Sequence, residues 1–223
     1  FQHCGVLKTT GLETGTSNLT SIGEEAFSSI MIKSISIPAT CTDIGKNAFT
    51  RCSKLQEIKV DEENSKYSSE DGILYDKNKE TLYLYPAAKT GSSYTTPSGL
   101  KTISSYAFEK NQRLRDVTIN DGVETIGRSA FQGAGVETVT MPDSVTSIGE
   151  LAFYDSKSLS EINLSNSLEE IPDYIFYNCS SLSEVEIPAS VKKIGSNILS
   201  GCENLEKVTI KSPELTSISS SVF

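Results

Sequence analysis

A nine-residue pattern recurs along the chain, and this repetition constrains the fold more than any other feature. The copies are LTSIGEEAF (19–27), CTDIGKNAF (41–49), LKTISSYAF (100–108), VETIGRSAF (123–131), VTSIGELAF (145–153), LEEIPDYIF (168–176), VKKIGSNIL (191–199) and LTSISSSVF (215–223). Their isoleucines follow one another at steps of 22, 59, 23, 22, 23, 23 and 24 residues. A period near 23 residues is typical of solenoid proteins, in which each repeat forms one coil of a stack.

A second short pattern after each phenylalanine predicts a β-strand. Segments such as EIKV, EINL and EVEI alternate apolar and polar residues, as strands with one buried face do. One unit cannot bury its apolar face alone, but stacked units bury it in continuous ladders. Ser104, Pro172 and Ser219 replace the glycine in three copies, so a positive φ is not needed in every coil, and we expect the glycine to allow either close backbone approach or an easy turn. The expected core ladder contains Phe1, Phe27, Phe49, Phe108, Phe131, Phe153, Phe176 and Phe223, with Leu199 in one rung.

The combined pattern, xxIxIPxxVxxIGxxAFxxCxxLxx, resembles the BspA-like, treponemal-type leucine-rich repeat over nearly the whole chain outside 61–96. The resemblance implies an α/β repeat solenoid, namely a right-handed leucine-rich-repeat array with short parallel strands, short helical or 3₁₀ arcs and one inserted β-hairpin. We expect residues 1–223 to form a single solenoid domain. Because the chain begins and ends within a repeat, we also expect it to be a segment of a longer array.

The long step of 59 residues marks an insert at about 61–96. Within it, Ile73–Tyr75 and Leu82–Tyr85 flank the polar turn DKNKE, which predicts a β-hairpin. Five of the nine tyrosines lie in the insert. Long loops of repeat proteins are often functional, so Tyr83 and Tyr85 are candidate binding residues. The alternative is that the hairpin covers the flank of neighbouring coils and buries its aromatic side chains there.

The composition excludes several classes of function. The net charge of −9 argues against nucleic acid, because binding phosphates needs a basic surface. No apolar run is long enough for direct membrane insertion. With a single histidine, no CxxC pair and no catalytic motif, we expect no enzyme activity, metal or cofactor. The five cysteines fall at small apolar positions, and we expect free thiols: Cys4, Cys41, Cys52, Cys179 and Cys202.

Two surfaces remain as candidate binding sites. If the strands form one sheet, their polar members make an open ladder on its outer face. The candidate residues on that face are Asp116, Glu161, Asn163, Glu184 and Glu186. A second candidate is an aromatic strip on the opposite side, formed by Tyr154, Tyr174 and Tyr177, with packing between coils as the alternative.

Members of the BspA-like leucine-rich-repeat family, which this sequence resembles, are typically surface or secreted proteins of bacteria, and several are adhesins. The resemblance therefore implies an extracellular or cell-surface, non-enzymatic, adhesin-like module that binds a host or microbial protein or glycan. We expect the segment to be a monomer. Two alternatives stay open: a structural spacer or stalk that displays another domain, and an accessory domain of a larger surface enzyme.

Overall fold

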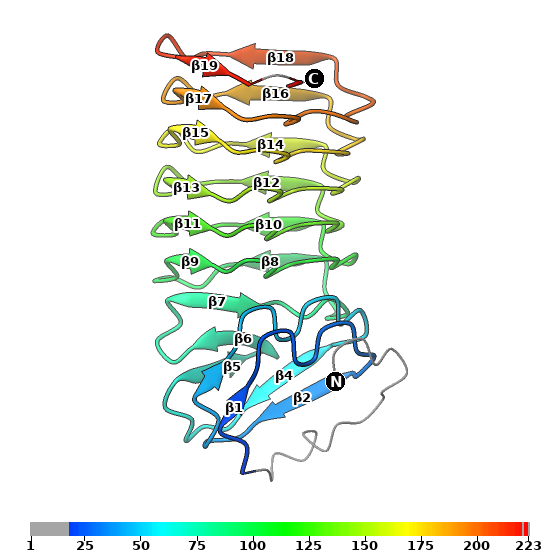
Figure 1. The fold of residues 1–223 in the computed structure, drawn as a ribbon, viewed down its shortest axis with the longest axis vertical. Helices are drawn as coiled ribbons and strands as arrows, with labels where there is room; N and C mark the ends of the chain where they lie inside the picture. The colour runs from blue at the N-terminus through cyan, green and yellow to red at the C-terminus, as the bar shows by residue number, and fades with distance from the viewer. Residues whose placement is uncertain (1–17, 220, 223) are drawn as a thin grey trace.

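The chain winds into a stack of flat coils in the computed structural model, which describes residues 18–219, 221 and 222 (Figure 1). Most coils contribute two strands. We call one set the main strands: β2 (Ser34–Ile37), β4 (Glu57–Val60), β8 (Ser93–Thr95), β10 (Asp116–Thr118), β12 (Thr138–Thr140), β14 (Glu161–Asn163), β16 (Glu184–Ile187) and β18 (Lys207–Ile210). The other set is the side strands: β1 (Ser21–Ile22), β3 (Asp43–Ile44), β7 (Thr81–Leu84), β9 (Thr102–Ile103), β11 (Thr125–Ile126), β13 (Ser147–Ile148), β15 (Glu170–Ile171), β17 (Lys193–Ile194) and β19 (Ser217–Ile218).

Neighbouring coils pair in parallel with equivalent residues opposite one another, as the repeat predicts. Val117 of β10 pairs with Val139 of β12, which in turn lies opposite Ile162 of β14. These three side chains are buried, whereas the polar residues on either side of them face outward. The 23-residue period thus fixes the register, because shifting a strand by one residue would turn its apolar side chain to solvent.

The arcs that follow the side strands contain no helix in the described residues, so the expected helical or 3₁₀ arcs are wrong. Two residues of an arc, four positions apart, have positive φ, for example Leu151 (60°) and Asp155 (59°). Their N–H groups donate to the next coil, whereas Tyr154 N closes a turn within the arc to Leu151 O at 3.0 Å. The positive φ values interrupt the run of right-handed residues that a helix needs. The described residues accordingly contain no helix that could cross a membrane.

The glycine in the repeat serves close backbone approach, one of the two expected roles. A Cβ on Gly149 would lie 2.4 Å from the backbone nitrogen of Arg128, and one on Gly127 would lie 2.4 Å from that of Ser105. Neither glycine has a positive φ. The coils therefore stack at a distance that side chains at these positions would not permit.

The expected aromatic ladder is present but interrupted. Successive rings stack at centroid distances of 4.7 Å (Phe108–Phe131), 5.0 Å (Phe131–Phe153) and 5.9 Å (Phe153–Phe176). Phe27 and Phe49 form a separate pair at 5.8 Å. Phe49 is not the neighbour of Phe108, because Tyr85 of the insert stacks on Phe108 at 5.3 Å. The outermost expected rungs, Phe1 and Phe223, lie outside the described residues.

The insert contains the expected hairpin and also completes a coil. Strand β6 (Ile73–Asp76) pairs antiparallel with β7 and with an additional strand, β5 (Tyr67–Glu70). Strand β7 also pairs in parallel with β9, and β8 pairs in parallel with β10. The end of the insert therefore supplies a shortened coil to the stack, with Tyr85 in the place of a phenylalanine. Two of its five tyrosines, Tyr75 and Tyr85, are buried, Tyr67 and Tyr94 are half-buried, and Tyr83 is exposed.

The insert also divides the hydrophobic core into two. Leu74 and Leu84 pack with the N-terminal coils, whereas Tyr75 and Tyr85 pack with the long stack that continues to the C-terminal end. We call the boundary between arcs 46–51 and 104–109 the seam. In Figure 1 the strands below the insert are visibly tilted relative to those above it.

Candidate functional site

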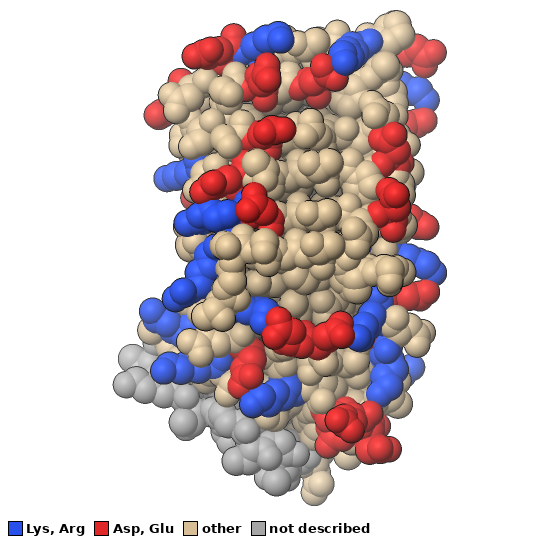
Figure 2. Space-filling model, turned by 180° about the vertical axis from the view of Figure 1, so that it is seen from behind, with Lys and Arg blue, Asp and Glu red and all other residues tan. Residues whose placement is uncertain are grey.

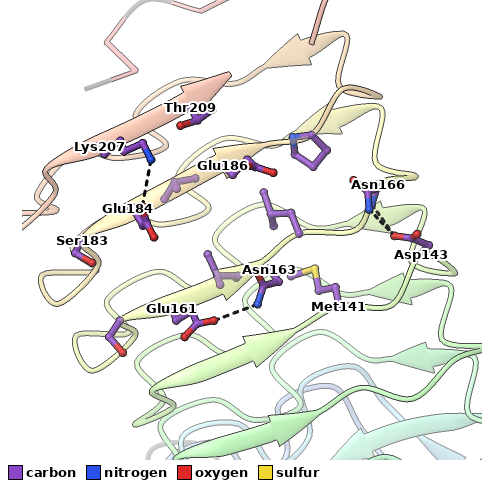
Figure 3. A pocket seen from close by; sticks show the side chains of 15 residues that line it. Met141, Asp143, Glu161, Asn163, Asn166, Ser183, Glu184, Glu186, Lys207 and Thr209 are labelled. Atoms are coloured by element: carbon purple, nitrogen blue, oxygen red, sulfur yellow. Dashed lines mark hydrogen bonds and ion pairs between the residues drawn. The ribbon is translucent and has the colours of Figure 1, made fainter. Parts of the chain in front are cut away.

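The main strands do not form the single sheet that the sequence predicts. They split into β2–β4, β8–β10–β12–β14 and β16–β18. Between β14 and β16 lies a hollow of about 560 Å³, which we call the acidic groove (Figure 3). Its walls carry Glu161, Asn163, Glu184 and Glu186, and apolar side chains such as Leu164 form its floor.

Pro172 explains why the sheets part at this level. In the other coils an N–H at the equivalent position bonds to the preceding side strand, as Gly149 N does to Ile126 O at 2.8 Å and Gly195 N to Ile171 O at 2.8 Å. Proline has no N–H, so the carbonyl of Ile148 loses this partner. Side strands β13 and β15 consequently lie in separate sheets, as do β14 and β16.

The arcs stay joined where the sheets part. Leu151 N, Phe153 N and Asp155 N still donate to the next coil at 3.1, 3.0 and 2.8 Å. The two blocks of the stack are therefore held together along the arcs and open along the main strands, which makes the groove a wedge. At one end the wedge closes where Ser190 Oγ, after β16, donates to the carbonyl of Leu168, after β14, at 2.7 Å. Asp143 lies one coil away, after β12, and its Oδ1 accepts from both the backbone and the side-chain nitrogen of Asn166 at 2.9 and 3.1 Å.

The charge of the groove is negative and only partly compensated. Glu184 pairs with Lys207 at 3.7 Å, and Glu186 pairs with Lys211 at 2.6 Å. Glu161 has no cation partner in the described part of the chain and accepts a hydrogen bond from Asn163 at 3.3 Å. All of these pairs are exposed and therefore weak, so an incoming cation could replace either lysine at little cost.

The structure thus brings together four of the five sheet-face residues that the sequence suggested. Asp116 lies apart on β10, where its carboxylate accepts a hydrogen bond from Thr138 Oγ1 at 2.9 Å. Asp143, Asn166 and Lys207 complete the groove and were not among the candidate residues. Pro172 was the available signal, because it is the one rung of the glycine ladder that cannot donate a hydrogen bond.

The tyrosine strip exists but does not form a stacking platform. Tyr154 and Tyr177 are parallel at 5.0 Å and 3°, and Tyr174 lies 5.8 Å from Tyr177 at 57°. Two rings stacked on each other cover one face of each, so less ring surface remains for a flat ligand. Packing between coils therefore accounts for Tyr154 and Tyr177, whereas Tyr174 is exposed.

The two candidate tyrosines of the insert differ in their position. Tyr83 is 39% exposed and contacts Tyr67 edge-on at 5.7 Å. Tyr85 is 2% exposed, and burial raises its pKa to about 12. A side chain so placed cannot reach a partner, so Tyr85 belongs to the core.

The cysteines have a structural role beyond that of small apolar residues. Cys52, Cys179 and Cys202 donate to the carbonyl oxygen of the phenylalanine one coil earlier, at 3.0, 3.1 and 3.1 Å. Ser156 occupies the same position and makes the same bond at 2.7 Å. These three cysteines and Cys41 are free thiols whose pKa burial raises. Cys4 lies outside the described residues.

The remaining surface carries charges of both signs. On the face opposite to that of Figure 1, basic and acidic side chains alternate along the two flanks of the stack, and the strip between them is largely uncharged (Figure 2). The described residues contain no group of three or more His, Cys, Asp or Glu suited to a metal ion.

Comparisons with known proteins agree with this architecture. The model of the BspA-type leucine-rich repeat region matches residues 1–86 and 101–223 in six copies. No curated protein matches the chain at a significant level.

Several solved structures are similar over most of the chain. A leucine-rich repeat protein of Eubacterium ventriosum is 31% identical, with a TM-score of 0.83 over 90% of this chain and 58% of its own. The pneumococcal vaccine antigen PcpA is 32% identical, with a TM-score of 0.68 over 92% and 45%. A leucine-rich cell surface protein of Faecalibacterium prausnitzii is 25% identical, with a TM-score of 0.65 over 90% and 55%. The chain therefore spans about half the length of these proteins.

Proposed function

Because the chain belongs to the BspA-type leucine-rich repeat family, we propose that it is a non-enzymatic, adhesin-like module of a bacterial cell-surface or secreted protein. We further propose that it binds a host or microbial protein through the acidic groove. Similar solved structures include a vaccine antigen and a cell surface protein, which supports the surface location. Parallel repeats with small variable side chains on one face are a scaffold that many binding proteins share.

The observation that carries the proposal is the opening between β14 and β16, where the repeat departs from its own pattern. Within each sheet the main strands form paired ladders, but here a hollow of about 560 Å³ combines an apolar floor with carboxylates on both walls. An arginine or lysine side chain of a partner could place its stem on Leu164 and its cation between Glu161 and Glu184. Partner contacts of this kind gain both apolar burial and charge-assisted hydrogen bonds.

The same groove favours a protein over a glycan. No aromatic residue is among those that line it, and the parallel tyrosines elsewhere cover each other. Exposed carboxylates that can pair with arginine and lysine suit a basic segment of a protein. A neutral glycan would use the carboxylates only as hydrogen-bond acceptors and would leave the negative charge uncompensated.

The experiment compares two variants of equal charge on arrays of purified matrix proteins and glycans. One variant carries Glu161→Gln, Glu184→Gln and Glu186→Gln. Its matched control replaces three exposed glutamates away from the groove: Glu62→Gln, Glu203→Gln and Glu214→Gln. Each variant loses three negative charges, so a general effect of net charge is the same in both.

We expect the wild-type chain to retain at least one basic protein, and the groove variant to bind it at least about tenfold more weakly than the control. A rise in salt concentration should weaken wild-type binding more than binding of the groove variant. If proteins bind equally to both variants, the groove is not the site. If the array retains nothing, the structural-spacer alternative replaces the binding function.

A further inference from the structure

A second groove opens at the seam, on the arc side of the stack. It has a volume of about 560 Å³ and lies between the arc of residues 46–50 and the arc of residues 104–106. Tyr83 and Leu84 of the insert line it between the two arcs. We call it the seam groove. Its lining is more apolar than that of the acidic groove, and it lies on different coils.

The seam groove exposes backbone donors that other coils use for stacking. In a regular arc, three alternate N–H groups bond to carbonyl oxygens of the next coil, as Phe131 N does to Ala152 O at 2.8 Å. The equivalent donors at the seam are the N–H groups of Asn47, Phe49 and Arg51. The shortened coil lies between them and the arc of residues 104–109. The N–H of Tyr85, in that coil, donates to the carbonyl oxygen of Ala107 at 2.8 Å, so this carbonyl is not available to the N–H groups of arc 46–51.

Only one of these three donors has an acceptor in the described residues. The N–H of Arg51 donates to Oε2 of Glu109 at 3.2 Å. Among residues 18–219, 221 and 222, none accepts a hydrogen bond from the N–H of Asn47 or from that of Phe49, although both residues line the seam groove. Backbone N–H groups in folded chains are almost always paired, so two unpaired donors in one row form an edge ready for an acceptor.

The carboxylate of Glu109 shows what kind of group this row of N–H donors binds. Its side chain is buried, and its other oxygen, Oε1, lacks a hydrogen-bond partner while lying 3.7 Å from Nε of Arg51. Burial raises the pKa of this carboxyl, and the Arg51 N–H together with the charges of Lys110 and Arg51 partly opposes that effect. An oxygen acceptor is therefore already bound at one end of the row, and two equivalent positions beside it are open.

We propose that the seam groove binds an extended segment of a partner protein by strand addition. In a closed arc, N–H groups two residues apart bond to carbonyls two residues apart, as those of Ser129 and Phe131 do to Glu150 O and Ala152 O. Asn47 and Phe49 have the same spacing, so a partner segment could present two carbonyls to them in the same way. The partner's main chain would accept from both N–H groups, and its apolar side chains would lie against Tyr83 and Leu84. Strand addition gains its affinity from such main-chain bonds and its selectivity from the pockets beside them.

Charge at the rim selects the kind of segment. Lys46 is exposed and has no ion-pair partner in the described part of the chain, whereas Arg128 pairs with Glu150. The uncompensated cation favours an acidic residue in the bound segment. The seam groove thus prefers the opposite charge from the acidic groove, so the two sites would take different segments.

The first test measures hydrogen exchange of backbone amides in the free chain by NMR. We expect the amides of Asn47 and Phe49 to exchange at least about 100-fold faster than those of Ser129 and Phe131, their equivalents in a closed arc. Equal protection of the two pairs would show that the seam is closed and would overturn the proposal.

The second test selects linear peptides from a random display library on the wild-type chain. The blocking variant is Ser105→Trp, which fills the groove from an exposed position. Its matched control is Ser196→Trp, at the equivalent position of an arc whose bonds to its neighbour are intact. Melting temperatures of both variants verify that each chain is folded.

We expect selected peptides to contain acidic and apolar residues and to slow exchange of the Asn47 and Phe49 amides. Ser105→Trp and Lys46→Glu should each weaken peptide binding at least about tenfold, and Ser196→Trp should leave it unchanged. The proposal fails if no peptide is enriched, or if the enriched peptides bind Ser105→Trp as tightly as the wild-type chain.

Discussion

Replacing Phe131 with alanine tests whether the ring ladder holds the stack together. The ring of Phe131 is fully buried and lies between Phe108 at 4.7 Å and Phe153 at 5.0 Å, nearly parallel to both. Removing a buried phenylalanine side chain costs about 3–5 kcal/mol in lost transfer free energy and cavity formation. Each lost ring pair accounts for about 0.5–1.5 kcal/mol of such an effect.

Phe49 provides the matched comparison, because it has a single stacked neighbour, Phe27 at 5.8 Å. We expect Phe131→Ala to lower the free energy of unfolding by about 4 kcal/mol, and Phe49→Ala by about 1 kcal/mol less because it loses one ring pair instead of two. Urea unfolding followed by circular dichroism measures both changes. A loss below about 1.5 kcal/mol for Phe131→Ala would refute the role of the ladder, since that is the effect of a poorly packed side chain.

Three further predictions concern polar groups. Burial raises the pKa of the Glu109 carboxyl in the folded chain above its ordinary value of about 4.3. The free energy of unfolding of the wild-type chain should therefore fall as the pH rises through that interval. Urea unfolding at pH 4 and pH 7 measures this fall, which the Glu109→Gln variant should lack. Asn64→Ala removes four hydrogen bonds to backbone groups, two of them buried, and should cost at least about 3 kcal/mol in urea unfolding; a loss below about 1 kcal/mol contradicts this. Pro172→Gly should create an amide that donates to the carbonyl of Ile148 and exchanges at least about 100-fold more slowly than an unpaired amide. The substitution should also weaken binding at the acidic groove. Fast exchange of the new amide contradicts the prediction.

The coil and its core were predictable because each copy of the repeat carries the same information. Ile103, Ile126 and Ile148 recur at one position, and a common apolar position in stacked units implies a common buried ladder. The hairpin was predictable for a similar reason, since a polar turn between two alternating segments has few other folds.

The form of the arcs was not predictable from the sequence pattern. Leu151, Tyr106 and Ser129 all adopt a positive φ at the same position of the repeat, where isolated propensity would disfavour it. Hydrogen bonds to the next coil compensate for this conformation, and such bonds exist only after the coils have stacked. The helical expectation failed because it considered one arc without its neighbours.

The two grooves escaped prediction because both arise from breaks in the pattern rather than from the pattern itself. Glu161 and Glu184 were visible as polar strand residues, but their separation into a wedge depends on a missing N–H at Pro172. Likewise, Tyr85 looked like a hairpin residue, and its role as a rung of the aromatic ladder depends on how the insert rejoins the stack. A single altered donor or rung changes geometry across a whole coil.

The wedge at Pro172 also gives the stack an uneven mechanical response. At this level the coils are joined by amide bonds along the arcs and by none between β14 and β16, so the arc side acts as the pivot of a hinge. Because the bonds of Leu151, Phe153 and Asp155 lie at the pivot, opening and closing of the wedge strain them little, whereas bending in the perpendicular plane must stretch the bonds at one end of the arc. A rod with such a joint flexes in one plane and stays stiff in the other. A partner held in the acidic groove would limit that flexing, so load on the rod and occupancy of the groove would be coupled.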